Sequence, residues 1–513
     1  MAEHKYTKEE LIQRFDGILE KTFEEIDDIG MFEHVLHEDF KLQKGIAGSV
    51  IEQCVLHYPP DTKQEADLVV VDNGENVNTE LKVTGMRISK DGGKAHFIAK
   101  EPMSITAVGV YELDQQTFCT SHFWNKLEHM LIVYYLYDSD KAVKPYDYKD
   151  FLVKGYEFHE FEETDKQTLA NDWRRVHSLI CDIIRDNPGT RDKEWKERVK
   201  QDYIERYGQL RSVLSYIDLA PKFPPRFRLK KPTVSTIIAK HFGYELEQLP
   251  GRYTSISDIE IKIMELTKQY RGKTIGELAD FFGVPKRTKD GKENKGIAEQ
   301  IIIKMFGGNS SKMNQIELFQ RFGLIGKSIT VTSSGGRTED MKLFHVHFDD
   351  IQQTTITDDD GTTRLFSFED SEMYSYFADN ELLCIIFEEP SHEAPLASNV
   401  FKGFKRLVFS DKFIDKYVRY VWEDTREKVL NGTLQDVIQK NKDGEVLKLK
   451  NGEISSAPNF MKGSQNIVFF RGSGTDSSLK YKTEIVNGIR MLPQYIWIKG
   501  TAIIKELNLS DIL

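Results

Sequence analysis

The chain has 513 residues, of which 39% are hydrophobic, 29% charged and 11% aromatic, a composition that excludes a broadly disordered protein. Its length exceeds that of one ordinary core and predicts two or three domains. The formal net charge of −11 gives no support to nucleic-acid binding. An enzyme that must release DNA can still keep its cations local, so the acidic total does not exclude one.

Several protein classes are disfavoured by local features. No apolar run approaches the length that spans a bilayer, so we expect no membrane partner. The polar and charged start is not a secretory signal. The four cysteines are far apart and lack metal-ligand spacing, which favours reduced thiols in a cytoplasmic protein.

The first elements along the chain are predicted to be helices. Apolar residues recur at helical spacing from Leu11 to Phe23, and a second helix is expected over Gly45 to Leu56. Strand signals then dominate from Ala66 to about Val110, with turns at Asn73-Gly74 and Asp91-Gly92-Gly93.

Helices are expected to follow, first over Phe123 to Tyr137 and then over a long charged stretch from Thr164 to about Tyr216. A proline-rich basic segment, Pro221 to Pro232, precedes a short apolar one, Val234 to Phe242. We place a domain boundary near residue 245.

The second half repeats marks of the first in the same order. Lys21–Glu25 resembles Lys273–Glu277, and Lys44–Ala47 is identical to Lys295–Ala298. A third, weaker echo links Pro225-Arg226-Phe227 with Pro493-Gln494-Tyr495. These marks predict a duplicated domain of roughly 250 residues, a usual size for one domain.

A candidate catalytic hairpin lies between residues 66 and 84. Asn73-Gly74 is the strongest short hairpin signal, because both residues tolerate positive φ. A two-residue turn there pairs positions whose numbers sum to 147, which sets Asp67 opposite Glu80. Directly opposed residues have Cβ atoms about 4.5–5.5 Å apart, so the two carboxylates repel unless a cation lies between them.

Mg²⁺ suits this pair, since it prefers oxygen ligands and is usually held by one or two carboxylates with a phosphate. Lys82 is on the same strand face as Glu80 and would bring an ammonium to the same place. The alternative is a solvated strand face, which also carries Glu and Lys. A spaced acidic pair with a lysine occurs by accident in many long proteins.

Four blocks, in the correct order, resemble the MutH mismatch-repair endonuclease family. They are KGIAGSVIE (Lys44–Glu52), ELKV (Glu80–Val83), TSH with a later KL (Thr120–His122, Lys126-Leu127), and RFRLKK followed by AKHF (Arg226–Lys231, Ala239–Phe242). The tandem arrangement is more similar to the GATC-cutting restriction enzymes of the Sau-three-AI type. Thr120–His122 also suits an N-terminal helix cap.

The resemblance implies a restriction-endonuclease-like α/β fold with two tandem MutH-like domains, residues 1–245 and 246–513. It implies Mg²⁺ as cofactor and double-stranded DNA containing GATC as substrate. The catalytic residues it implies are Asp67, Glu80, Lys82, Glu52 and Lys126, with Asp67, Glu80 and Glu52 as metal ligands. For Glu52 and Lys126 the alternative is a solvated helix face.

The basic segment is the candidate DNA-binding element. We expect Arg226, Arg228, Lys230 and Lys231 to contact phosphates or a guanine edge, together with Lys44. Arg228 stands where the MutH family has a tyrosine that senses adenine methylation, so methylation discrimination does not carry over. The alternative is that these charges only solvate a strand.

The second copy has lost its acidic residues. Aligned on the repeated marks, Ile303 takes the place of Glu52, Ile325 that of Glu80, and Lys327 that of Lys82. The first acidic position falls near Glu317, in a segment aligned with the catalytic hairpin. We therefore expect residues 246–513 to bind DNA without cutting it, as an effector or clamp. A structural buttress is the alternative, because fold alone does not give function.

The predicted function is that of a type II restriction endonuclease, a monomer in solution that dimerises on DNA or binds two sites at once. Two rivals differ from it. One is a strand-nicking repair endonuclease, which the large second half disfavours. The other is a non-catalytic DNA-binding protein, which the intact first-half residues disfavour.

Overall fold

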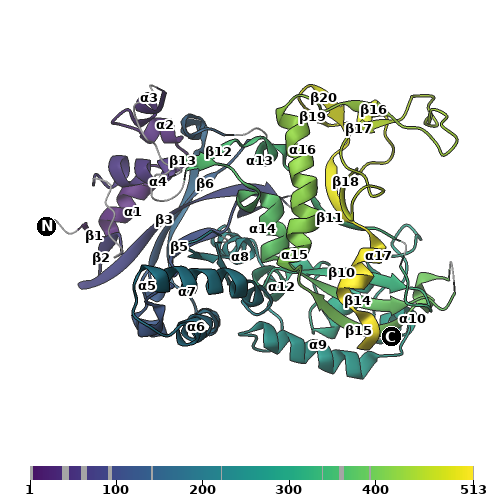
Figure 1. Ribbon diagram of the computed structural model, residues 1–513, viewed down its shortest axis with the longest axis horizontal. Coiled ribbons are helices and arrows are strands. Elements are labelled where there is room, and N and C mark those ends of the chain that lie inside the picture. Colours follow the sequence, from purple (N-terminus) through teal and green to yellow (C-terminus); the bar gives the residue numbers. More distant parts are fainter. Residues whose placement is uncertain are drawn as a thin grey trace.

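The computed structural model describes residues 4–36, 45–58, 66–89, 95–139, 143–220, 222–337, 339–357, 363–391 and 394–511 (Figure 1). Lys44 and the expected turn at Asp91-Gly92-Gly93 lie outside these residues. Within them, helices long and apolar enough to traverse a bilayer are absent.

A mixed β-sheet forms the centre of the first half, in the order β1-β2-β3-β6-β7 with β4 also paired to β3. Its strands are β1 (Lys5–Thr7), β2 (Leu68–Asp72), β3 (Glu75–Ser89), β4 (His96–Ala99), β6 (Met130–Leu136) and β7 (Leu152–His159). The β2–β3 hairpin has the predicted register, since Leu68 pairs with Thr79. Asn73 and Gly74 turn it with φ of 51° and 85°.

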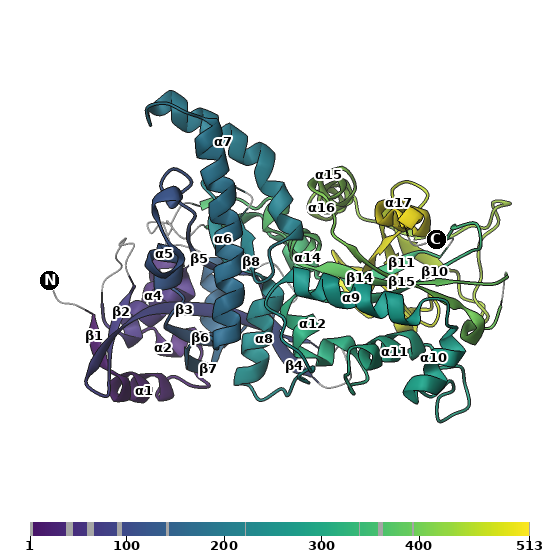
Figure 2. The ribbon, with the colours of Figure 1, turned by 90° about the horizontal axis from the view of Figure 1, so that it is seen from below.

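Helices cover the two faces of this sheet. One face packs against α1 (Lys8–Asp16), α2 (Phe23–Ile26), α3 (Met31–Leu36) and α4 (Ile46–Val50), which continues as the π-helical turn η1 (Ile51–Val55). The other packs against α5 (His122–Asn125), α6 (Glu163–Asp186), α8 (Lys231–His241) and a small sheet of β5 (Met103–Ala107), β9 (Arg226–Leu229) and β8 (Ile217–Leu219), while α7 (Lys193–Arg206) packs on α6. Figure 2 shows α6 and α7 standing out from this half.

The expected helix over Phe123 to Tyr137 is wrong beyond its first turn. Helix α5 ends at Asn125, and Met130–Leu136 is the strand β6. This strand lies between β3 and β7 and is buried along almost its whole length. A strand covered on both faces reads as an unbroken apolar run, which periodicity does not distinguish from a buried helix.

In the part of the second half that the structure describes, the sheets are β10-β14-β15 and β11-β21-β18, each of three strands, and the two-stranded pairs β12-β13, β16-β17 and β19-β20. Its strands are β10 (Leu324–Val331), β11 (Met341–His345), β12 (Thr355–Thr357), β13 (Thr363–Leu365), β14 (Glu381–Glu388), β15 (Val400–Leu407), β16 (Asp436–Ile438), β17 (Ser456–Pro458), β18 (Val468–Gly472), β19 (Glu484–Val486), β20 (Ile489–Met491) and β21 (Gln494–Ile498). Its helices are α9 (Ile256–Tyr270), α10 (Ile275–Phe282), α11 (Ile297–Met305), α12 (Glu317–Arg321), α13 (Phe348–Gln352), α14 (Glu372–Asp379), α15 (Asp411–Phe413), α16 (Tyr420–Leu430) and α17 (Gly500–Leu507).

The two halves share a pattern of strand pairing. Strand β3 runs parallel to β6, which is antiparallel to β7, and β10 is parallel to β14, which is antiparallel to β15. Thr22 and Thr274 form capping boxes on α2 and α10, and each bridges to a residue of its half, Leu152 or Val400. The repeated sequence marks therefore occupy equivalent places in the two halves.

The junction before the last helix of each half is also alike. The backbone N–H of Lys230 donates to Tyr216 at 2.9 Å, and that of Lys499 donates to Ile467 at 3.0 Å. Lys230 therefore corresponds to Lys499, a separation of 269 residues. The sequence match between Pro225 and Pro493 therefore differs by one residue from this structural equivalence.

One expected equivalence fails. The segment Ile316–Val331 was aligned with the catalytic hairpin, but its first part is the helix α12 and only its second part is a strand, β10. The residues before β10 lack the Asn-Gly turn that folds β2 onto β3. Nothing in this segment therefore corresponds to strand β2.

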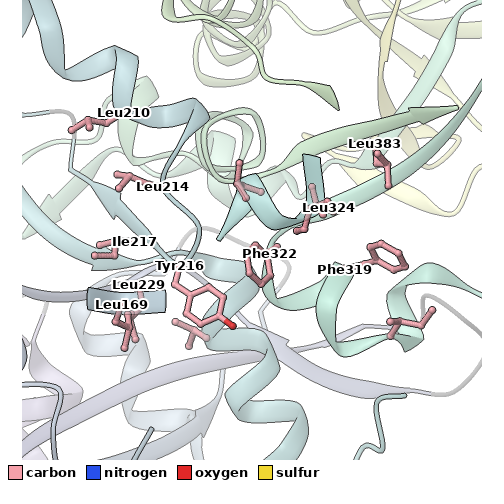
Figure 3. Packing of buried hydrophobic residues seen from close by; sticks show 14 of the residues in the cluster. Leu169, Leu210, Leu214, Tyr216, Ile217, Leu229, Phe319, Phe322, Leu324 and Leu383 are labelled. Atoms are coloured by element: carbon pink, nitrogen blue, oxygen red, sulfur yellow. The ribbon is translucent and has the colours of Figure 1, made fainter. Parts of the chain in front are cut away.

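The apolar core crosses the expected boundary near residue 245 without a break. Buried residues of the first half, such as Leu169, Tyr216 and Leu229, belong to the same cluster as Phe322 and Leu383 of the second (Figure 3). Helix α8 packs directly against α12. The two halves are therefore joined by a shared interior as well as by the chain.

Candidate active site

The hairpin brings Asp67 and Glu80 to one face of the sheet. The register of β2 and β3 continues from Leu68 opposite Thr79, which sets the next pair, Asp67 and Glu80, side by side. Asp67 Oδ2 accepts a hydrogen bond from the backbone N–H of Leu81 at 2.9 Å. This bond fixes the Asp67 carboxylate beside the strand that carries Glu80.

Two lysines hold the Glu80 carboxylate. Lys82 Nζ is 2.8 Å from Oε1, and Lys126 Nζ is 2.9 Å from both Oε1 and Oε2. The Glu80 side chain is only 2% exposed, and the lysines are 18% and 11% exposed. An isolated carboxylate at this depth would be costly, and the two ammonium groups compensate for its burial.

Lys126 reaches the site from the end of α5. Ser121 caps this helix, as expected, by accepting the Trp124 N–H at 3.1 Å. Phe123, Trp124 and Leu127 are buried and anchor the helix against the sheet. Lys126 therefore projects from a fixed support onto Glu80, and the structure brings it together with Asp67, Glu80 and Lys82.

The electrostatics of Asp67 reflect its neighbours. Burial and the adjacent Glu80 carboxylate together raise the pKa of Asp67 to about 6, against the opposing effects of Lys82 and Lys126. Two carboxylates and two ammonium groups share the site, so its formal charge is zero. A pair of facing carboxylates whose mutual repulsion raises a pKa is a donor set that fits a divalent cation.

Glu52 is placed differently from the other candidates. It lies on η1, and the buried residues of α4 and η1 pack in the cluster on the face of the sheet opposite Glu80. In the described ranges, no three His, Cys, Asp or Glu side chains gather closely enough to hold a metal ion. The structure therefore brings two of the three expected carboxylates together, and a metal-binding role for Glu52 stays a prediction.

The basic segment is more buried than the sequence suggests. Lys230 is 3% exposed and its Nζ donates to Leu214 O at 2.7 Å. The Arg228 guanidinium pairs with Asp218 and is 15% exposed. These contacts correct the expectation that both side chains face DNA, because each is used inside the fold.

Two other residues of the segment remain nearer the surface. Arg226 Nε donates to Ser104 Oγ at 3.0 Å, and Lys231 Nζ lies 3.4 Å from Glu372 Oε1 at 24% exposure. Arg226 and Arg228 are partly buried, alternating along β9 with the buried Phe227 and Leu229. Lys44, the remaining candidate, lies outside the described residues.

A second polar cluster on the same sheet face was missed by the sequence analysis. Ile132 on β6 pairs with Lys82 on one side and with Glu157 of β7 on the other, so Glu157 and Lys82 lie in one row across the sheet. Hydrogen bonds from His159, His241 and Tyr134 lower the pKa of Glu157 to about 2 against the opposing effect of burial. The alternation of Glu157 and His159 was a usable signal, but His241 comes from α8, far away in the sequence.

The equivalent place in the second half is not acidic. Ile325 and Lys327 lie on β10 and pair with Leu382 and Cys384 of β14. Lys327 Nζ donates to the backbone carbonyl of Lys342 at 2.9 Å, and burial lowers its pKa. Glu317, the nearest acidic candidate, is on α12 and pairs with Lys240 at 2.9 Å.

Comparison with known proteins gives two matches. Residues 56–172 match the family model described as DNA mismatch repair enzyme MutH. Over 459 residues the chain is 21% identical to the type II restriction enzyme Sau3AI of Staphylococcus aureus, covering 84% of this chain and 86% of that enzyme. The MutH match contains Asp67, Glu80, Lys82 and Lys126, and the longer alignment extends well into the second half.

Proposed function

We propose that this chain belongs to the MutH and Sau3AI family of nucleases and is a type II restriction endonuclease that cuts double-stranded DNA at GATC with Mg²⁺. The observation that carries the proposal is the assembly at Glu80. One buried carboxylate is held by Lys82 and Lys126 and faces a second carboxylate, Asp67.

Asp67 and Glu80 are the residues that would hold the metal ion. When bound, Mg²⁺ would polarise the scissile phosphate and supply an activated water. Lys82 and Lys126 add positive charge where the phosphorane gains negative charge, because their ammonium groups converge on the same carboxylate. The low exposure of Glu80, Lys82 and Lys126 strengthens these interactions.

The second half is proposed to be a MutH-like domain that binds DNA and does not cut it. The shared strand pairing, the two capping boxes and the equivalent lysine junctions support a duplication. Ile325 in the place of Glu80, and a helix in the place of β2, support the loss of metal binding. Its role would be that of an effector or clamp that engages a second GATC.

Incubating supercoiled plasmid with the full-length protein and Mg²⁺ tests the proposal. Discrete fragments with ends at GATC are expected. Nicked circles without linear products would instead favour a strand-nicking repair endonuclease. Unchanged plasmid, together with a shifted band in a binding assay, would favour a non-catalytic DNA-binding protein. End-sequencing of the fragments identifies the bond that is cut.

A further inference from the structure

A cleft of about 480 Å³ lies in the second half, away from the candidate active site. Its walls come from β18, the segment before α17 and the residues around β17, the yellow strands at the right of Figure 1. Among its lining residues are the cations Lys462, Arg471 and Lys499, and the polar side chains of Gln439 and Ser455. The lining thus combines positive charge with hydrogen-bond donors.

The positive charge of the cleft is not balanced by its own walls. Asp340 is the one carboxylate among the lining residues, and it pairs with Arg471 at 2.6 Å. The Arg471 guanidinium also lies over the rings of Phe469 and Trp497, 4.9 and 4.7 Å from their centroids. These contacts fix the guanidinium in place, and the charges of Lys462 and Lys499 stay in excess.

The corresponding place in the first half contains anions. Lys230 is equivalent to Lys499, and its surroundings include two buried acids of the second half, Asp379 and Glu381. Burial raises the pKa of Asp379 to about 7, and Lys230 is among the cations that oppose this rise. In one half the lysine at this junction faces protein carboxylates, and in the other it faces an open cleft.

From this asymmetry we infer that the cleft at Lys499 binds a backbone phosphate of double-stranded DNA. A phosphodiester supplies the anion that balances Lys462 and Lys499, whose ammonium groups can donate to its oxygens. The inference rests on the proposed DNA-binding role of the second half and adds the surface that would perform it. A free phosphate ion shares this chemistry and is separated by the test.

The test compares Lys499→Gln with Lys505→Gln in the full-length protein. Lys505 is an exposed lysine in the last turn of α17, the helix that Lys499 precedes, and it lies outside the cleft. Affinity for a GATC duplex is measured in EDTA, where Mg²⁺-dependent cutting is blocked, over a series of salt concentrations. Loss of one phosphate contact should lower the salt slope by about 1 and, at about 0.1 M salt, the affinity by roughly five- to tenfold.

Protection from lysine acetylation, read by mass spectrometry, locates the contact directly. The duplex should protect Lys499 and Lys462 but leave Lys505 reactive. Protection by inorganic phosphate alone, with none by the duplex, would overturn the assignment to DNA. Equal salt slopes and equal reactivity of Lys499 with and without duplex would overturn the inference altogether.

These outcomes separate the inference from the proposed function. If the wild-type protein cuts plasmid but Lys499→Gln leaves the salt slope of duplex binding unchanged, only the inference about the cleft is contradicted. Failure of the wild-type protein to bind or cut any duplex would contradict the proposed function itself.

Discussion

Lys82 and Lys327 occupy equivalent strands of the two halves and have opposite surroundings. Lys82 Nζ meets the Glu80 carboxylate at 2.8 Å, whereas Lys327 Nζ meets a backbone carbonyl at 2.9 Å. Burial lowers the pKa of Lys327, and the opposing effects of Cys384 and Glu299 do not offset its desolvation. The lysines on equivalent strands therefore meet a carboxylate in one half and a backbone carbonyl in the other.

The difference comes from the element that precedes the strand. In the first half the β2–β3 hairpin supplies Asp67 and sets it beside Glu80. In the second half the helix α12 stands before β10, and its Glu317 pairs with Lys240 and Arg321. The proposed metal site depends on two strands in register, and the second half has a helix in the place of one of them.

The largest effect is expected from Glu80→Gln. This change removes the charge that faces Asp67 while keeping the size of the side chain and an acceptor oxygen for the lysines. The cleavage rate with Mg²⁺ should fall by at least about 100-fold, the scale seen when one electrostatic group of a transition state is lost. Single-turnover cutting of a GATC plasmid measures it.

Lys327→Met is the matched control for Lys82→Met. Both changes keep the aliphatic stem, but only Lys82 contacts a carboxylate of the proposed site. Lys82→Met should abolish cutting, and Lys327→Met should leave the rate unchanged. Near-normal cutting by a folded Glu80→Gln or Lys82→Met protein would overturn the site, and comparable losses from Lys82→Met and Lys327→Met would break the contrast between the halves.

The sequence predicted the local parts of this site well. The Asn73-Gly74 turn fixed the register, and alternation placed Lys82 beside Glu80, because both depend only on neighbouring residues. The Ser121 cap was predicted for the same reason. Local signals of this kind need no knowledge of the rest of the fold.

Features that depend on distant packing were not predicted. The strand β6 was taken for a helix because its burial comes from β3 and β7. The burial of Lys230 and Arg228 comes from contacts with Leu214 and Asp218. The shared core between the halves likewise arises only when the whole chain folds.

A further prediction concerns the contact between the two halves. Arg87, on the same strand as Glu80, pairs with Asp349 at 2.6 Å and approaches Glu372 at 3.5 Å, both in the second half. Arg87→Met would leave the buried Asp349 without its paired cation, whereas Glu372 keeps Lys231 as a neighbour, and the cost should be about 3–5 kcal/mol in the free energy of unfolding. Urea unfolding followed by circular dichroism measures the change.

The Arg87→Met result also reports on how the halves are joined. Since their core is shared, we expect one unfolding transition in the wild-type protein and a lower midpoint in the variant. Exposed Arg185, 71% exposed and paired with Asp182, is the control, and Arg185→Met should shift the midpoint little. Two separate transitions in the wild-type protein would show that each half folds on its own.

The pH dependence of the free energy of unfolding should distinguish the acidic site of the first half from the equivalent place in the second half. The folded-state pKa of Asp67 is raised from 3.8 to about 6, so the folded protein holds this proton more tightly than the unfolded chain does. Without metal, the free energy of unfolding should therefore fall as the pH rises from about 4 to about 6, by up to about 3 kcal/mol, and then level off. Asp67→Asn should remove this component.

Urea unfolding in EDTA, compared between the wild-type protein and Asp67→Asn across this range, measures the component. Saturating Mg²⁺ should abolish it, because a bound cation favours the charged carboxylate. Identical pH profiles of the two proteins would show that Asp67 does not carry the raised pKa.

The smallest effect is expected at β9, where one arginine should affect the stability of the fold and the other should affect DNA binding. Arg228 pairs with Asp218 inside the fold, so Arg228→Ala should lower the midpoint of urea unfolding. Arg226 is bonded to Ser104 and lies nearer the end of the strand, so Arg226→Ala should weaken duplex binding and reduce its salt slope by about 1. Base reading by Arg226 would appear instead as lost discrimination between GATC and an altered site, by roughly 1–3 kcal/mol.

Binding titrations in EDTA with both duplexes, beside urea unfolding of both variants, separate the two roles. If Arg226→Ala changes only the unfolding midpoint, then β9 is structural along its whole length, and the DNA contacts of the first half must be sought elsewhere.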